Sequence, residues 1–150
     1  MRRPASKRFR SDWTWLGPRS LRSVLSNPCP CGTGAAYAAC CGRFHHGEAA
    51  PTAERLMRSR YAAFAVGDRG YLFRTWHPRT RPEEVVLEPS LTWEGLEITD
   101  VVAGGANDEA GEVAFVARWR TTDGRRGEVV ERSRFARRAG RWLYLDGDLG

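Results

Sequence analysis

Four cysteines lie within 13 residues of this chain, and their spacing constrains the possible fold more than any other feature of the sequence. Cys29 and Cys31 form a C-x-C pair, eight residues follow, and Cys40 and Cys41 are adjacent. A glycine-containing turn and a short alanine-rich stretch separate the pairs, so the chain can reverse and bring the four thiols together. Because zinc prefers four thiolate or imidazole ligands at about 2.0–2.3 Å in a tetrahedron, the pattern predicts one closed zinc site.

The alternative to a metal site is a disulfide or redox-active cluster. The adjacent cysteines cannot pair with each other without strain, and disulfides within so short a segment close small loops that stabilise little. Two arginines follow the first Met, but no apolar core of an export signal comes after them, so we expect a cytoplasmic protein with reduced thiols. His45 and His46 follow closely enough to replace one cysteine as a ligand.

The residues around the cysteines resemble a known zinc-binding motif. The run at 29–34 (CPCGTG), the tyrosine at 37 and the run at 40–42 (CCG) are similar to the SEC-C motif. This module lies at the C-terminus of the motor of the preprotein translocase and in many bacterial proteins, and its usual form has Ser where Thr33 stands. The resemblance implies that zinc is held by four cysteines, namely Cys29, Cys31, Cys40 and Cys41.

Two further motifs extend the resemblance over about residues 28–148. The runs at 51–64 (PTAERLMRSRYAAF) and 75–78 (TWHP) are similar to the YchJ-like family, uncharacterised bacterial proteins that join a SEC-C motif to a nuclear-transport-factor-two-like domain. The resemblance implies a metal and a cone-shaped, cystatin-like fold, but no known reaction. We therefore divide the chain into a basic, disordered tail (1–27), a SEC-C-like zinc motif (28–47) and a nuclear-transport-factor-two-like domain (48–150).

The charge of the chain lies in its first residues. Residues 1–23 carry seven basic side chains and one acidic one, and the rest of the chain has 17 arginines against 17 acidic residues, for a net charge of +6. A nucleic-acid interaction is therefore expected only through the tail. No apolar stretch approaches the roughly 18 residues that a membrane span requires, so no membrane interaction is expected.

Two helices are predicted after the cysteine motif. Thr52 is a favourable N-cap, apolar residues then recur at every third or fourth position, and Gly67 ends the pattern. Asp68 caps a shorter second helix that ends before Pro78. Three arginines of the first helix are expected to face solvent: Arg55, Arg58 and Arg60.

The hydrophobic period changes to two after residue 90, which predicts an antiparallel meander of four strands. The expected strands are 91–98, 112–120, 127–137 and 141–146, with a bulge at Gly95 and turns at 123–124 and 139–140. In the third strand, Val129, Glu131, Ser133 and Phe135 are expected to share one face. The sequence therefore predicts an α+β fold in which two helices pack on a bent antiparallel sheet, preceded by a small zinc knuckle.

Such a sheet and helix pair can enclose a cavity, or an ordinary aromatic core can fill the same space. His77 is the one histidine outside the cysteine region and is the weak candidate for a catalytic acid or base, with Asp100 and Asp146 as possible partners. The candidate pocket residues are Tyr61, Trp76, His77, Trp93, Phe115, Trp119, Arg134 and Tyr144.

Two classes of function follow from these patterns. A closed four-thiolate site leaves zinc no open position for chemistry, which favours a binding or adaptor module with a protein or ribosome partner, as the translocase motif implies. The alternative is a small-molecule-binding protein or enzyme that uses the aromatic cavity with His77 as its polar group.

Overall fold

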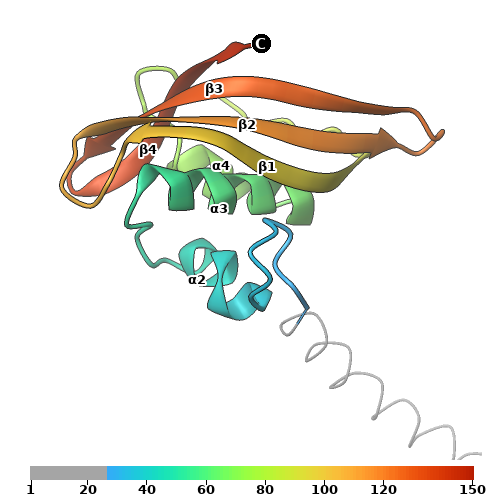
Figure 1. The fold of residues 1–150 in the computed structure, drawn as a ribbon, viewed down its shortest axis with the longest axis horizontal. Helices are drawn as coiled ribbons and strands as arrows, with labels where there is room; N and C mark the ends of the chain where they lie inside the picture. Colours follow the sequence, from blue (N-terminus) through green and yellow to red (C-terminus); the bar gives the residue numbers. More distant parts are fainter. Residues whose placement is uncertain (1–26) are drawn as a thin grey trace, which may run out of the picture.

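The computed structural model describes residues 27–150, and the predicted disordered tail lies outside the described residues except for Asn27. A four-stranded sheet forms one layer, the helices α3 (Ala53–Val66) and α4 (Arg69–Arg74) cover one of its faces, and a small cysteine-rich knuckle packs on the far side of α3 (Figure 1). The knuckle contains a 3-10 turn, η1 (Tyr37–Ala39), and the short helix α2 (Cys41–His45). This is the predicted α+β architecture.

Both predicted helices form where their caps indicate. The side chain of Thr52 accepts a hydrogen bond from the Arg55 backbone N–H at 3.1 Å, and Gly67 ends α3 at φ +81°, a conformation that favours glycine. The side chain of Asp68 accepts from the Tyr71 backbone N–H at 3.0 Å and starts α4. The chain leaves α4 at Thr75, earlier than Pro78, because Trp76 forms a parallel bridge with Tyr144 of the last strand.

One arginine of α3 lies on the buried side of the helix, which overturns one prediction. Arg60 was expected to face solvent, but only 4% of its surface is exposed. It follows Leu56 by four residues and Met57 by three, so it lies on the buried stripe of the helix. Its length lets the guanidinium reach polar partners inside the protein, which makes burial of the charge tolerable.

The sheet is the predicted meander. Strands β1 (Leu91–Ala103), β2 (Ala110–Thr121), β3 (Arg126–Arg138) and β4 (Arg141–Leu149) follow one another in space as in sequence, and all pair antiparallel. The expected bulge lies between Trp93 and Gly95. Ala139 and Gly140 both have positive φ, +51° and +78°, as a two-residue hairpin of the type I′ class requires.

The inner face of the sheet forms the core with α3. Alternation places Val113, Phe115 and Ala117 of β2 on this face, each at most 7% exposed, and Phe135 of β3 is 1% exposed. Because Ser133 is also buried, the predicted inward set of β3 is confirmed for its last two members. Among residues 27–150, no helix is both long enough and apolar enough to cross a membrane.

Candidate metal centre and cavity

The knuckle brings all four cysteines together. Their sulfur atoms lie within 4.8 Å of one another and all four residues are buried. The Sγ atoms of Cys31 and Cys40 are 3.6 Å apart. A zinc ion with four sulfurs at about 2.3 Å in a tetrahedron has sulfur–sulfur edges of about 3.8 Å. The cluster therefore has the donor type, number and spacing that a closed zinc site needs.

Local backbone geometry builds this cluster. The Cys29 N–H donates to the carbonyl of Ala35 at 2.8 Å, so the chain reverses immediately after the first cysteine pair. Gly32 and Gly34 both have φ +87°, which confirms the tight turn expected between the pairs. Gly42 follows the second pair, and a Cβ atom there would lie 2.7 Å from the carbonyl oxygen of Tyr37. The knuckle therefore requires glycine where the two halves of the loop meet.

The thiol groups of the cluster are hydrogen-bonded to one another, and these hydrogen bonds change their pKa values. Hydrogen bonds to Cys29 and Cys31 raise the pKa of the Cys41 thiol, whereas hydrogen bonds from Cys29 and Cys41 lower the pKa of Cys31. The Thr33 hydroxyl lies 3.1 Å from Cys40 Sγ and can donate to that sulfur. A bound dication favours loss of the thiol protons.

The two nearby histidines are engaged elsewhere. The Nε2 atom of His45 donates to the Ser59 carbonyl at 2.9 Å, and its Nδ1 atom accepts from the Tyr37 hydroxyl at 2.6 Å. The Nδ1 atom of His46 lies 2.7 Å from the Gly42 carbonyl. Among the described residues, the group of side chains that could hold a metal ion consists of the four cysteines. Neither histidine replaces a cysteine in this group.

The buried imidazole of His45 leads to a prediction about acid stability. Burial lowers the pKa of His45, so the folded protein favours the neutral ring. The unfolded chain takes up a proton below about pH 6.5, and the stability that the neutral ring supports is lost as pH falls through that value, by at most about 1.4 kcal/mol per pH unit. Urea unfolding of wild type and His45→Gln between pH 5.5 and 8, with zinc content measured at each pH, checks this. Equal pH slopes at constant zinc content would contradict it.

The knuckle is fastened to the helices by polar contacts and by one aromatic side chain. Arg58 of α3 donates to the Cys31 carbonyl at 3.0 Å, and Arg74 of α4 donates to the His45 carbonyl at 2.7 Å. The ring of His45 packs on Tyr71 with a centroid distance of 4.6 Å. Phe44 is 2% exposed and belongs to the same hydrophobic core as the α3 residues. The knuckle and the helices are therefore packed as one body.

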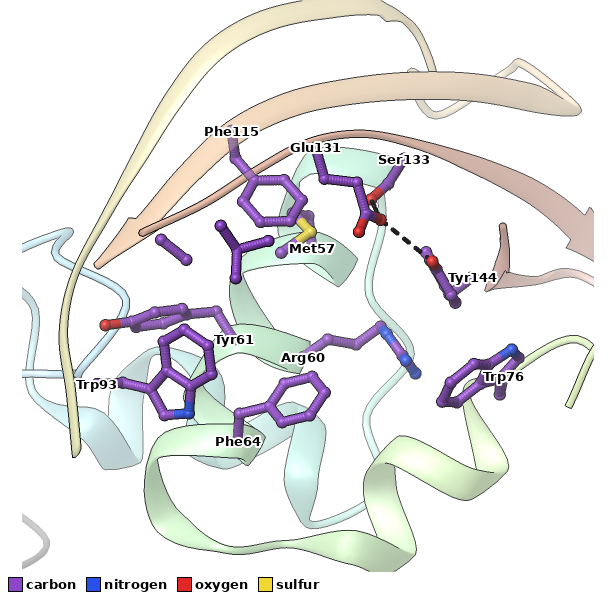
Figure 2. Close-up of a pocket in the computed structure, with 12 residues that line it drawn as sticks. Met57, Arg60, Tyr61, Phe64, Trp76, Trp93, Phe115, Glu131, Ser133 and Tyr144 are labelled. Atoms are coloured by element: carbon purple, nitrogen blue, oxygen red, sulfur yellow. Dashed lines mark hydrogen bonds between the residues drawn. The ribbon is translucent and has the colours of Figure 1, made fainter. Parts of the chain in front are cut away.

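A separate cavity of about 300 Å³ lies between α3 and the inner face of the sheet (Figure 2). Five of the residues predicted for a pocket line it: Tyr61, Trp76, Trp93, Phe115 and Tyr144. The remaining lining comes from one long apolar side chain, Met57, one further aromatic, Phe64, and the residues Arg60, Ala117, Val129, Glu131 and Ser133. The cavity is mostly apolar and contains two side chains that can carry charge.

Three predicted pocket residues do not line this cavity. Trp119 lies two residues beyond Ala117 on β2, and its ring covers Gly127 of the neighbouring strand instead. Arg134 alternates with the buried Ser133 and Phe135, so it lies on the outer face of the sheet, where it pairs with two aspartates. Strand parity and position along the strand, rather than residue type, decide which side chains reach the cavity.

His77 also lies outside the cavity lining. Its backbone N–H donates to the Tyr144 carbonyl at 2.7 Å, and its Nδ1 atom accepts from the Arg79 backbone N–H at 3.1 Å. The proposed partners are engaged with arginines, since Asp100 pairs with Arg132 and Asp146 pairs with Arg134. The acid–base set suggested by the sequence is therefore not assembled, and His77 precedes a turn in which the backbone N–H groups of Thr80 and Arg81 donate to its carbonyl.

Sequence reasoning missed the two charged groups that do line the cavity, Arg60 and Glu131. The Arg60 Nη1 atom donates to the Leu72 carbonyl at 2.9 Å and to the Thr75 hydroxyl at 2.7 Å. Burial lowers the pKa of Arg60 to about 10, so the side chain stays charged at neutral pH. A usable signal existed for both residues, because Arg60 shares the apolar helix stripe and Glu131 shares the inward parity of Val129.

The carboxylate of Glu131 is hydrogen-bonded by side chains of the sheet. Its Oε2 atom accepts hydrogen bonds from the Ser133 hydroxyl at 2.6 Å and the Tyr144 hydroxyl at 3.1 Å, as Figure 2 shows. Burial, with the nearby Glu131 charge, raises the pKa of Tyr144, so this hydroxyl remains a donor. The Trp76 Nε1 atom is buried without a hydrogen-bond partner among the described residues.

Comparisons with known proteins agree with this architecture. The family model described as YchJ, middle NTF2-like domain, matches residues 52–147, and the SEC-C motif model matches residues 26–43. A UPF0225 protein of Streptomyces coelicolor is 55% identical over 122 residues, covering 81% of this chain and 94% of the relative. A UPF0225 protein of Xanthomonas campestris is 47% identical over 126 residues, covering 83% of this chain and 96% of the relative.

Two solved structures of SEC-C motif containing proteins share the fold. The solution structure from Rhodopseudomonas palustris has a TM-score of 0.69 and 31% identity, covering 81% of this chain and 98% of that one. The crystal structure from Psychrobacter arcticus has a TM-score of 0.67 and 26% identity, covering 85% of each chain. The likeness thus extends over the knuckle and the sheet together.

Proposed function

We propose that this chain, which belongs to the YchJ-like family that joins a SEC-C motif to an NTF2-like domain, is a zinc-binding protein whose zinc ion is structural. The observation that supports this is the set of four buried sulfurs within 4.8 Å of one another. Zinc bound there would cross-link the two halves of the knuckle, and four protein ligands leave no position for a substrate. The cytoplasm is the expected compartment, because it keeps such thiols reduced.

Metal content tests the proposal directly. We expect one zinc per chain in reduced, purified protein, held by Cys29, Cys31, Cys40 and Cys41. Titration of the thiols before and after denaturation should show four that become reactive only when the metal is released. Protein without metal whose cysteines are paired in two disulfides would contradict the zinc proposal and favour redox chemistry.

The hydroxyl beside the cluster offers a finer test of the zinc site. Thr33→Val removes the hydroxyl that lies 3.1 Å from Cys40 Sγ while keeping the shape of the side chain. We expect zinc affinity to fall by about 10- to 100-fold, the usual cost of losing a hydrogen bond to a metal ligand. Competition with a chromophoric chelator measures the change. Thr33→Ser keeps the hydroxyl and serves as the matched control, and equal affinities for the two variants would contradict the role of this hydrogen bond.

We further propose that the knuckle acts as an adaptor for a protein or ribosome partner. Its outward side consists of small exposed residues at 32–35, together with Ala38 and Ala39. Such a surface, held rigid by a metal, loses little conformational entropy on binding. We expect wild-type protein to sediment with purified ribosomes and the double variant Ala38→Glu, Ala39→Glu to remain in the supernatant with its zinc retained. Val86→Glu, at an exposed position, is the control. Equal sedimentation of the wild type, the double variant and Val86→Glu would contradict the ribosome proposal.

A second candidate function is the binding of a small molecule in the cavity. A mostly apolar space of about 300 Å³ with a few polar groups is typical of ligand sites. Arg60 and Glu131 take the polar role that the sequence suggested for His77. Ligands that enter the cavity should raise the thermal midpoint by mass action, and a screen by thermal shift would detect them.

A further inference from the structure

We propose that the cavity between α3 and the sheet binds a small, planar, apolar molecule that carries a carboxylate, and that Arg60 is the anchor for this carboxylate. The inference depends on the second candidate function, the binding of a small molecule, and names the class of ligand. It is independent of the zinc site, which lies on the other side of α3 (Figure 1).

The buried guanidinium of Arg60 has one edge without a hydrogen-bond partner among the described residues. Arg60 is 4% exposed, and both hydrogens of its Nη1 atom are engaged with Leu72 and Thr75. No hydrogen bond joins its Nε or Nη2 atom to another residue in the described part of the chain. These two nitrogens form one edge of the guanidinium, and their parallel N–H groups match the two oxygens of a carboxylate.

Arg60 is held in place but lacks a counterion at contact distance among the described residues. Its guanidinium carbon lies 5.1 Å from the ring centroid of Trp76 and 4.7 Å from that of Tyr144. Figure 2 shows the side chain extended along the cavity toward these two rings. Among residues 27–150, no carboxylate lies within 4.0 Å of an Arg60 nitrogen. A buried cation is costly without such a partner, and a ligand carboxylate would supply one.

The rest of the cavity favours a planar, apolar ligand. Away from Arg60 the walls are aromatic, with Tyr61 and Trp93 in edge contact at 6.0 Å and Phe64 and Phe115 close by. Flat apolar groups pack well against such rings. The volume of about 300 Å³ is at the lower end of the range for ligand pockets, which favours a molecule with one or two rings.

The carboxylate of Glu131 favours a ligand with one negative charge over a ligand with two. Its carboxylate is part of the same cavity lining, so the site already contains one negative charge. A dianion such as inorganic phosphate would meet stronger repulsion from it than a monoanion. With a single arginine to receive the anion, the arrangement favours a carboxylate over a phosphate.

The test compares an acid with its neutral analogue. Phenylacetate and indole-3-acetate are the probes, and phenylacetamide is the uncharged analogue of the first. Titration calorimetry on the full chain should show that phenylacetate binds at least tenfold more tightly than phenylacetamide. Tryptophan fluorescence should change on binding, because Trp76 and Trp93 line the cavity.

Substitutions test whether Arg60 and Glu131 determine the affinity for the carboxylate. Arg60→Gln should weaken phenylacetate binding by about 10- to 100-fold and leave phenylacetamide binding unchanged, since a charged hydrogen-bonding partner is lost. Glu131→Gln should strengthen phenylacetate binding several-fold by removing the like charge. Arg134→Gln, which changes an arginine on the outer face, should have no effect.

One further variant keeps the test decisive if Arg60→Gln does not fold. Ala117 is 3% exposed and lines the cavity, so Ala117→Phe should fill the space and abolish binding of every probe with zinc content unchanged. Equal binding of phenylacetate and phenylacetamide, or unchanged phenylacetate affinity in Glu131→Gln, would overturn the carboxylate assignment while small-molecule binding stands. Absence of binding by all three probes would overturn the assignment, and a thermal-shift screen without any stabiliser would also remove the second candidate function.

Discussion

Replacing Cys31 with serine is expected to release zinc and to lower the free energy of unfolding by at least about 5 kcal/mol. Structural zinc sites contribute roughly 10–16 kcal/mol of binding free energy, and a site with one weaker ligand keeps only part of it. Cys31 is 0% exposed, so the serine hydroxyl would also be buried among sulfurs. Thermal unfolding followed by circular dichroism, with zinc content measured for each variant, checks the prediction.

A chelator provides the control for this substitution. Wild-type protein treated with a strong chelator should lose the same stability as Cys31→Ser, and added zinc should restore the wild-type protein alone. Amide hydrogen exchange should show lost protection first in residues 28–47. An unchanged thermal midpoint after complete removal of zinc would contradict a structural role for the metal.

Replacing Phe44 with alanine is expected to cost about 3–5 kcal/mol, the usual loss for a large buried aromatic side chain. Phe44 is 2% exposed and belongs to the same buried cluster as Leu56 of α3, Tyr71 of α4 and Trp142 of β4. The substitution therefore weakens the contact between the knuckle and the rest of the fold without touching a zinc ligand. Urea unfolding measures the change in free energy.

The same variant shows whether the knuckle and the sheet unfold together. Because their buried side chains form one continuous cluster, we expect Phe44→Ala to lower the stability of the whole chain in a single transition with zinc still bound. Phe73→Ala is the matched control, since Phe73 is 37% exposed, and it should cost less than about 1 kcal/mol. Two separate transitions in Phe44→Ala would show that the knuckle is an independent unit.

Much of the fold was predictable because the relevant signals are local. Thr52 and Asp68 cap helices through residues three positions away, and the glycines of the knuckle turn and the hairpins act within their own turns. The alternation in β2 and β3 depends on the period of a strand alone. The four cysteines also required no long-range knowledge, since one short loop brings their sulfurs together.

The cavity required information that spacing does not contain. Residue type suggested His77, Trp119 and Arg134, yet the sheet register sends Arg134 outward and the bridge beside β4 engages His77. Strand parity pointed to Glu131 but could not show that Tyr144, thirteen residues later, would donate a hydrogen bond to it. Such contacts arise between elements, so only their packing reveals them.

The amino-acid sequence therefore specified the cysteine cluster, the order of helices and strands, and the alternation of β2 and β3, because these depend on neighbouring residues. The burial of Arg60 follows from the packing of α4, Trp76 and β4 around it on the sheet side of α3, and the docking of Phe44 follows from the knuckle on the other side. Spacing along the helix places Arg60 on the same stripe as Leu56 and Met57, whereas only the packing of α4 and β4 over that stripe encloses its guanidinium. That enclosure creates the buried cation on which the proposed ligand site depends.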